Sequence, residues 1–146
     1  MLNKTQSNYL WRTSWFSLIA SLYGLYNNHK IAILPGLIFI TSLNHWRNPV
    51  RGSWRQRTDI ITVITSIYLQ KIFGDKLEYY PMYLIILTIG LSFYPMALYF
   101  SSRNYIWKSV ISHSGIHIFG NLANLALYSS NSTDSIEVAN LTKIVC

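Results

Sequence analysis

The sequence predicts an all-α, polytopic transmembrane helical bundle with four to five membrane segments, and composition and charge patterning are the observations behind this prediction. Of the 146 residues, 51% are hydrophobic and only 12% are charged, whereas about a quarter of the residues in a soluble domain carry charge. The charges cluster in short stretches between apolar segments, and a soluble fold of this size could not hide all of those segments in one core. The expected organisation is a single bundle over residues 1–128 and a polar C-terminal tail over 129–146.

The apolar segments follow one another with short polar connections. They lie at roughly 13–27, 31–46, 58–73, 80–101 and 105–128. Only the fourth matches by itself the roughly 20 apolar residues of a lone spanning helix, so the others are expected to be packed together, tilted or partly re-entrant. The polar turn at 26–30 predicts a tight helical hairpin between the first two segments. Pro35 and Gly36 should begin or bend the second helix.

Aromatic and cationic residues mark the borders of these segments. Trp and Tyr rings favour the headgroup region of a bilayer, and here they recur near the segment ends as Trp11, Trp15, Trp46, Trp54, Tyr79, Tyr80, Tyr105 and Trp107. With a cytosolic N-terminus, 8 of the 12 Lys and Arg residues lie on the cytosolic side, which matches the preference of cytosolic loops for cations. The net charge of +7 therefore indicates juxtamembrane cations facing a lipid bilayer, and not a nucleic-acid partner.

Polar residues inside the apolar segments form stripes at helical spacing. His113, His117, Asn121 and Asn124 follow at intervals of four, four and three residues, so they share one face of the last helix. Such a stripe should face protein or water and not lipid, because polar groups at membrane depth are costly.

Two further groups of polar residues point to the same place. Asp59, Thr62, Ser66 and Gln70 form a stripe on the third segment, and Ser42 and His45 share a face at the end of the second. The loop between these two segments returns the chain to the same side of the bilayer. The stripes are therefore expected to converge.

His113 and His117 have the spacing at which two imidazoles can hold one metal ion from a single helix. A third ligand from His45 would complete the three-histidine set of a catalytic zinc ion with an open position. Asp59 could then act as general base toward a water molecule or orient a ligand, and Ser42 could hydrogen-bond the substrate or the water.

Each of these residues also has a plain structural interpretation. A histidine pair at helical spacing in a membrane bundle is often an interhelical hydrogen-bonding patch without chemistry. Asp59 alone is more often a helix N-cap or the partner of Arg55 or Arg57.

Taken in order, these residues resemble the CREST membrane hydrolases, which include alkaline ceramidases, adiponectin-receptor-type proteins and the Per1 type. The sequence Ser42-Leu-Asn-His45 closes one predicted helix, Asp59 opens the next, and His113-Ser-Gly-Ile-His117 lies in the last. The resemblance implies zinc ligands His45, His113 and His117, with Asp59 and Ser42 beside the attacking water, a site toward the cytosolic side, and hydrolysis of an amide in a lipid such as ceramide. Two features differ: the family's serine usually lies four residues before its histidine, and its core has seven helices.

Two other classes of function stay open. The first is a non-catalytic accessory or scaffold protein whose polar stripes serve helix packing, within a homo-oligomer or a membrane complex. The second is a small channel or carrier in which the stripe from His113 to Asn124 lines a hydrated path.

Overall fold

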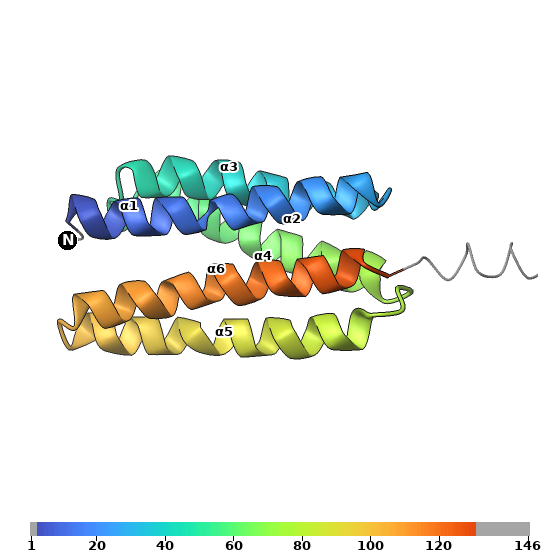
Figure 1. Ribbon diagram of the computed structural model, residues 1–146. Coiled ribbons are helices and arrows are strands. Elements are labelled where there is room, and N and C mark those ends of the chain that lie inside the picture. The colour runs from blue at the N-terminus through green and yellow to red at the C-terminus, as the bar shows by residue number, and fades with distance from the viewer. Residues whose placement is uncertain (1–2, 131–146) are drawn as a thin grey trace, which may run out of the picture.

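The computed structural model describes residues 3–130 and is helical almost throughout (Figure 1). The helices are α1 (Lys4–Thr13), α2 (Trp15–Tyr26), a single 3-10 turn (Lys30–Ala32), α3 (Ile33–Arg47), α4 (Trp54–Gly74), α5 (Tyr80–Ser102) and α6 (Ile106–Tyr128). No strand occurs between residues 3 and 130. The all-α prediction is therefore confirmed, and the five predicted segments all fall on helices. Of the predicted tail, only Ser129 and Ser130 belong to the described residues.

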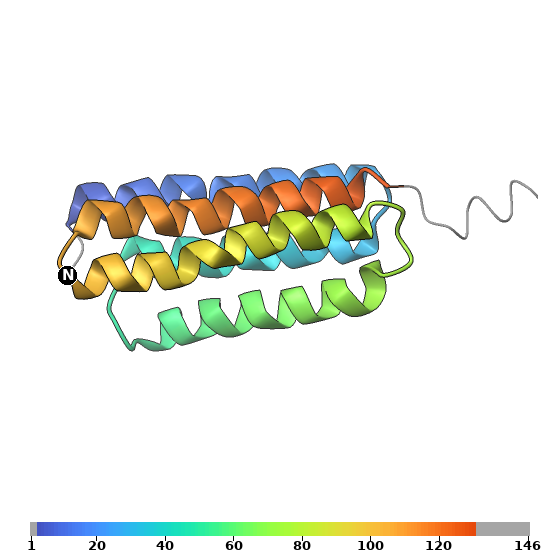
Figure 2. The same ribbon diagram turned by 90° about the horizontal axis from the view of Figure 1, so that it is seen from below.

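The helices run side by side as an elongated bundle (Figures 1 and 2). The short helices α1 and α2 follow each other end to end, α3 returns along α2, and α4 packs against α3. The helices α5 and α6 form an antiparallel hairpin, and α6 also lies against α1 and α2. Figure 2 shows α4 at one edge of the bundle, next to α3 and across from α5.

Two hairpin connections end their helices in the same way. Asn28 and Asn104 adopt left-handed backbone conformations with φ of 62° and 60°, which asparagine tolerates better than most residues. In each case the next residue closes the turn: the His29 amide donates to the Gly24 carbonyl, and the Tyr105 amide donates to the Phe100 carbonyl, both at 2.9 Å. The predicted turn between the first two segments is confirmed.

The start of α4 differs from the prediction. Ser53 caps the helix by accepting a hydrogen bond from the Gln56 amide at 3.3 Å, and the Gln56 side chain accepts one from the Gly52 amide. Because this cap fixes the first turn at Trp54, the helix begins four residues before the predicted segment. Asp59 consequently lies inside the helix and does not open it or cap it.

The hairpin of α5 and α6 is held at close range by glycines. A methyl group added to Gly90 would meet Cβ of Phe119 at 3.0 Å, and one added to Gly115 would meet the Phe93 ring at 2.9 Å. Small residues at such contacts let helix backbones approach each other. This close pairing fixes the face that α6 turns toward α3 and α4.

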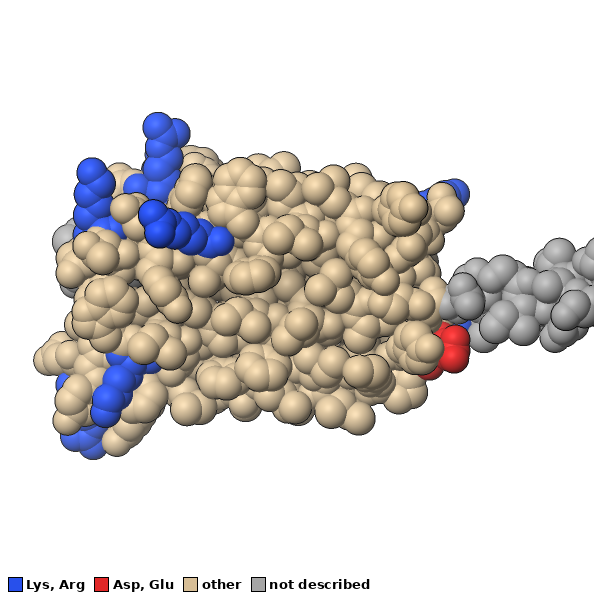
Figure 3. Space-filling view, viewed as in Figure 1, with Lys and Arg blue, Asp and Glu red and all other residues tan. Residues whose placement is uncertain are grey.

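The surface of the bundle is apolar between two charged ends. Figure 3 shows most of the visible Lys and Arg side chains at the end where α1 begins, acidic side chains together with some basic ones at the opposite end, and no charged side chain across the middle of this face. Many large apolar side chains point outward, among them Ile61 and Ile64 on α4 and Ile85 on α5, each more than 60% exposed. Among the helices of residues 3–130, one, α5, is long and apolar enough by length and composition to cross a membrane.

Candidate functional site

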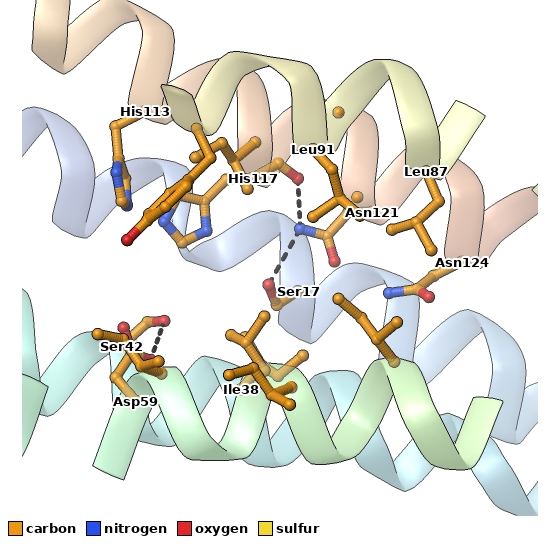
Figure 4. Close-up of a pocket in the computed structure, with 18 of the residues that line it drawn as sticks. Ser17, Ile38, Ser42, Asp59, Leu87, Leu91, His113, His117, Asn121 and Asn124 are labelled. Atoms are coloured by element: carbon orange, nitrogen blue, oxygen red, sulfur yellow. Dashed lines mark hydrogen bonds between the residues drawn. The ribbon is translucent and has the colours of Figure 1, made fainter. Parts of the chain in front are cut away.

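A cavity of about 330 Å³ lies inside the bundle between α4 on one side and α5 and α6 on the other (Figure 4). Helices α2 and α3 contribute Ser17, Ile38 and Ser42 to its wall. The lining is mostly apolar, and most of its polar residues come from the stripes predicted on α4 and α6. Because α4 lies at the edge of the bundle, the cavity separates it from the α5–α6 hairpin.

The cavity opens toward the outside of the bundle between α4 and α5. Several of its lining residues are also surface residues: Ile60 and Ile64 of α4 are 43% and 62% exposed, and Leu91 and Tyr94 of α5 are 42% and 49% exposed. Helices α4 and α5 make few contacts with each other, so they do not close this side of the cavity. The opening is therefore framed by apolar and aromatic side chains.

One end of the cavity holds Asp59, which is almost completely buried. Its Oδ1 atom accepts a hydrogen bond from the Ser42 hydroxyl at 2.6 Å and another from the Thr41 hydroxyl at 3.0 Å. Both hydroxyls come from the last turns of α3, so the carboxylate joins α4 to α3. The second oxygen, Oδ2, has no hydrogen-bond partner among the described residues. It stays available to a group inside the cavity.

His113 and His117 face this carboxylate from α6 (Figure 4). Their ring centroids are 5.4 Å apart, as expected for residues one turn apart on the same helix face. The Nε2 atom of His117 is buried and has no hydrogen-bond partner. The prediction that these two histidines face the interior is confirmed.

His45 lies near the pair but outside the cavity wall. It is 4% exposed and is absent from the cavity lining. Its ring packs on Trp46 at a centroid distance of 4.4 Å, and Trp46 meets His113 at 5.0 Å. The Nδ1 atom of His45 and the Nε1 atom of Trp46 are both buried without a hydrogen-bond partner. Trp46 lies near the end of α3, as predicted, but its ring is only 7% exposed and contacts both His45 and His113.

Residues 3–130 contain no group of three or more His, Cys, Asp or Glu side chains that could hold a metal ion as they stand. Ser42, Asp59, His113 and His117 line one cavity, as the sequence predicted. His45 is the member of the predicted set that does not line this cavity.

The other end of the cavity is closed by a hydrogen-bonded network around Gln70 of α4. Its Nε2 atom donates to Oδ1 of Asn124 at 2.8 Å and to the Tyr128 hydroxyl at 2.9 Å, both on α6. Its Oε1 atom accepts from the Tyr83 hydroxyl of α5 at 3.0 Å. These bonds tie α4 to the hairpin, so α4 is fastened at both ends of the cavity.

Sequence reasoning missed three residues of this site. Thr41 was overlooked although it directly precedes Ser42 in the sequence, and its hydroxyl donates to the same carboxylate oxygen. Ser17 accepts a hydrogen bond from Asn121 Nδ2 at 3.0 Å, and a signal for it was the run of small polar residues at helical spacing on α2. Nothing in the sequence indicated that Trp46 would turn inward.

Comparison of the chain with family models, with curated proteins and with solved structures found no match. The site is therefore interpreted from its own geometry and chemistry.

Proposed function

We propose that this chain is a multi-pass membrane protein that binds zinc at the histidine end of its cavity and hydrolyses an amide in a lipid. The proposal joins the predicted CREST-like constellation to the cavity that Ser42, Asp59, His113 and His117 line. Two sets of observations support it, one on the surface of the bundle and one inside it.

The surface supports a bundle that spans a bilayer. The 23 residues of α5 and of α6 and the 21 residues of α4 correspond to about 31 to 35 Å of helix, which matches a hydrocarbon core of about 30 Å. The outward-facing apolar side chains would be costly to expose to water, but lipid would cover them. The cations gathered at one end (Figure 3) match a cytosolic surface.

The observation that supports zinc most directly is the pair of buried imidazole nitrogens without partners, Nδ1 of His45 and Nε2 of His117. Buried polar atoms in proteins nearly always have a hydrogen-bond partner, and each exception calls for an explanation. Three imidazoles with one open position are a common ligand set of catalytic zinc. Zinc binding would have to bring His45 and the pair on α6 closer together than they lie in this structure.

Side chains of the protein would orient and deprotonate the water molecule beside that ion. When bound, zinc would lower the pKa of a water molecule and polarise the substrate carbonyl. Asp59 would accept the proton through Oδ2, while the hydroxyls of Thr41 and Ser42 hold Oδ1 and so fix the direction of the carboxylate. The apolar cavity would receive the hydrocarbon chain of a lipid through the opening between α4 and α5.

Elemental analysis of detergent-purified protein after extensive dialysis tests this proposal. We expect about one zinc ion per chain, lost in His113→Ala and in His117→Ala, because each removes a ligand. His29→Ala is the matched control, since His29 lies in the α2–α3 connection and hydrogen-bonds to the Ser130 carbonyl. Hydrolysis of ceramide-like lipids should follow the zinc content.

A well-folded native protein without zinc would overturn the proposal. An accessory protein would then be the better interpretation, because the fully bonded Gln70 network shows that polar residues of this bundle already join three helices.

A further inference from the structure

The row of polar residues on α6 continues beyond the histidines into the apolar part of the cavity. Figure 4 shows His117, Asn121 and Asn124 along the same wall. Neither asparagine has a role in the proposed zinc site. Both are 6% exposed, and both line the cavity.

Each of these two amides uses one of its polar atoms inside the protein. Asn121 Nδ2 donates to the Ser17 hydroxyl at 3.0 Å and to the His117 carbonyl at 2.6 Å. Asn124 Oδ1 accepts from Gln70 Nε2 at 2.8 Å. These bonds fix which end of each amide points away from the protein.

The other atom of each amide has no partner among the described residues. Asn121 Oδ1 is a free acceptor, and Asn124 Nδ2 is a free donor. Neither belongs to the completely enclosed unpaired atoms, which are on His45, Trp46 and His117. Because the two residues are otherwise buried, these atoms are accessible from the cavity.

We propose that Asn121 and Asn124 form a second binding site in the cavity, which takes a hydroxyl group borne in the middle of a ligand's hydrocarbon chain. A hydroxyl both donates and accepts, so it would donate to Asn121 Oδ1 and accept from Asn124 Nδ2. An apolar chain without such a group would leave both amide atoms buried and unpaired, which is unfavourable.

The position along α6 sets where that hydroxyl lies in the ligand. Asn121 and Asn124 follow His117 by four and seven residues, which corresponds to about 6 and 10 Å along the helix axis. A chain whose reacting amide lies near His117 would therefore present its hydroxyl several carbon atoms further on. The assignment rests on the proposed function in taking the ligand to be a lipid amide whose reacting group lies near His117.

Equilibrium binding in detergent micelles without added metal tests the site. The probes are a long-chain fatty amide with one mid-chain hydroxyl and the same amide without it. We expect the native protein to bind the hydroxylated amide about tenfold more tightly, the effect of one to two neutral hydrogen bonds. Asn121→Ala and Asn124→Ala should lose this preference, because the hydroxyl loses a partner and the plain chain no longer leaves that amide atom unpaired.

Two control variants separate recognition from structural support. Ser17→Ala removes one partner of Asn121, whose Nδ2 atom still donates to the His117 carbonyl, so the direction of the amide is kept. Tyr68→Phe changes an exposed side chain of α4 outside the cavity lining. Both should keep a preference for the hydroxylated amide.

Three results would overturn the site: equal binding of the two amides, binding of neither, or an equal loss of preference in the controls and the asparagine variants. A preference in a protein that holds no zinc would support this site and reject the proposed hydrolase. Zinc binding without a preference would do the reverse.

Discussion

Replacing Gln70 by leucine should loosen the attachment of α4 to the rest of the bundle. The substitution keeps the size of the side chain nearly unchanged but removes three hydrogen bonds, to Asn124, Tyr128 and Tyr83. Side-chain hydrogen bonds between membrane helices average about 0.6 kcal/mol each. Three of them predict a loss of about 2 kcal/mol in the free energy of unfolding, with a further cost from the polar partners left unpaired.

The loss can be measured by unfolding the protein with increasing SDS in mixed micelles and following tryptophan fluorescence. Tyr83→Phe removes one of the three bonds and should cost about 0.6 kcal/mol. Tyr68→Phe is the matched control, because Tyr68 also belongs to α4 but is 62% exposed. If Gln70→Leu changed the free energy of unfolding no more than Tyr68→Phe, the network would not hold α4, and the reasoning would fail.

Two other predictions concern packing and topology. Gly115→Ala should lower stability by about 1 to 3 kcal/mol, because its methyl group would press on the Phe93 ring at 2.9 Å. Gly120→Ala on the same helix has no atom within 4 Å of the added methyl group and should leave stability unchanged or raise it by up to about 1 kcal/mol. Cysteines placed in the 48–53 and 27–29 connections should react with a membrane-impermeant thiol reagent from opposite sides of a vesicle; labelling of both from one side would contradict a spanning bundle.

The helices could be predicted from the sequence because hydrophobic runs and turn residues are local signals. The helix boundaries that differ from the predicted ones depend on capping hydrogen bonds and on polar residues, which a hydropathy pattern does not reveal. The cap formed by Ser53 started α4 at Trp54, ahead of the apolar residues, and α1 formed from residues too polar to be included in the first segment. The packing order of the helices depended on close contacts such as that of Gly90 on Phe119, which no local pattern reveals.

The candidate site was predictable to the extent that helical periodicity places residues on a face. The stripes put His113 and His117 on the inner face of α6 and Asp59 on the inner face of α4, and the structure places them at one cavity. The third histidine could not be placed in the same way, because its position depends on where its neighbour Trp46 points. A large ring that fills a gap between helices is a property of the packed bundle and not of the sequence around it.

The distinction between packing and chemistry in this bundle lies in which polar atoms remain unpaired. Every polar atom of the Gln70 side chain is hydrogen-bonded within the protein. Its role in joining α4 to α5 and α6 is therefore sufficient to explain why a polar residue is buried here. The cavity wall of α6 is different, because His117, Asn121 and Asn124 each keep at least one side-chain polar atom without a partner among the described residues. A bundle held together only by polar packing would gain stability by pairing or removing those atoms. Their presence along one wall of an apolar cavity is therefore the physical reason to expect a ligand there, with a metal ion at one end and a polar group on a lipid chain at the other.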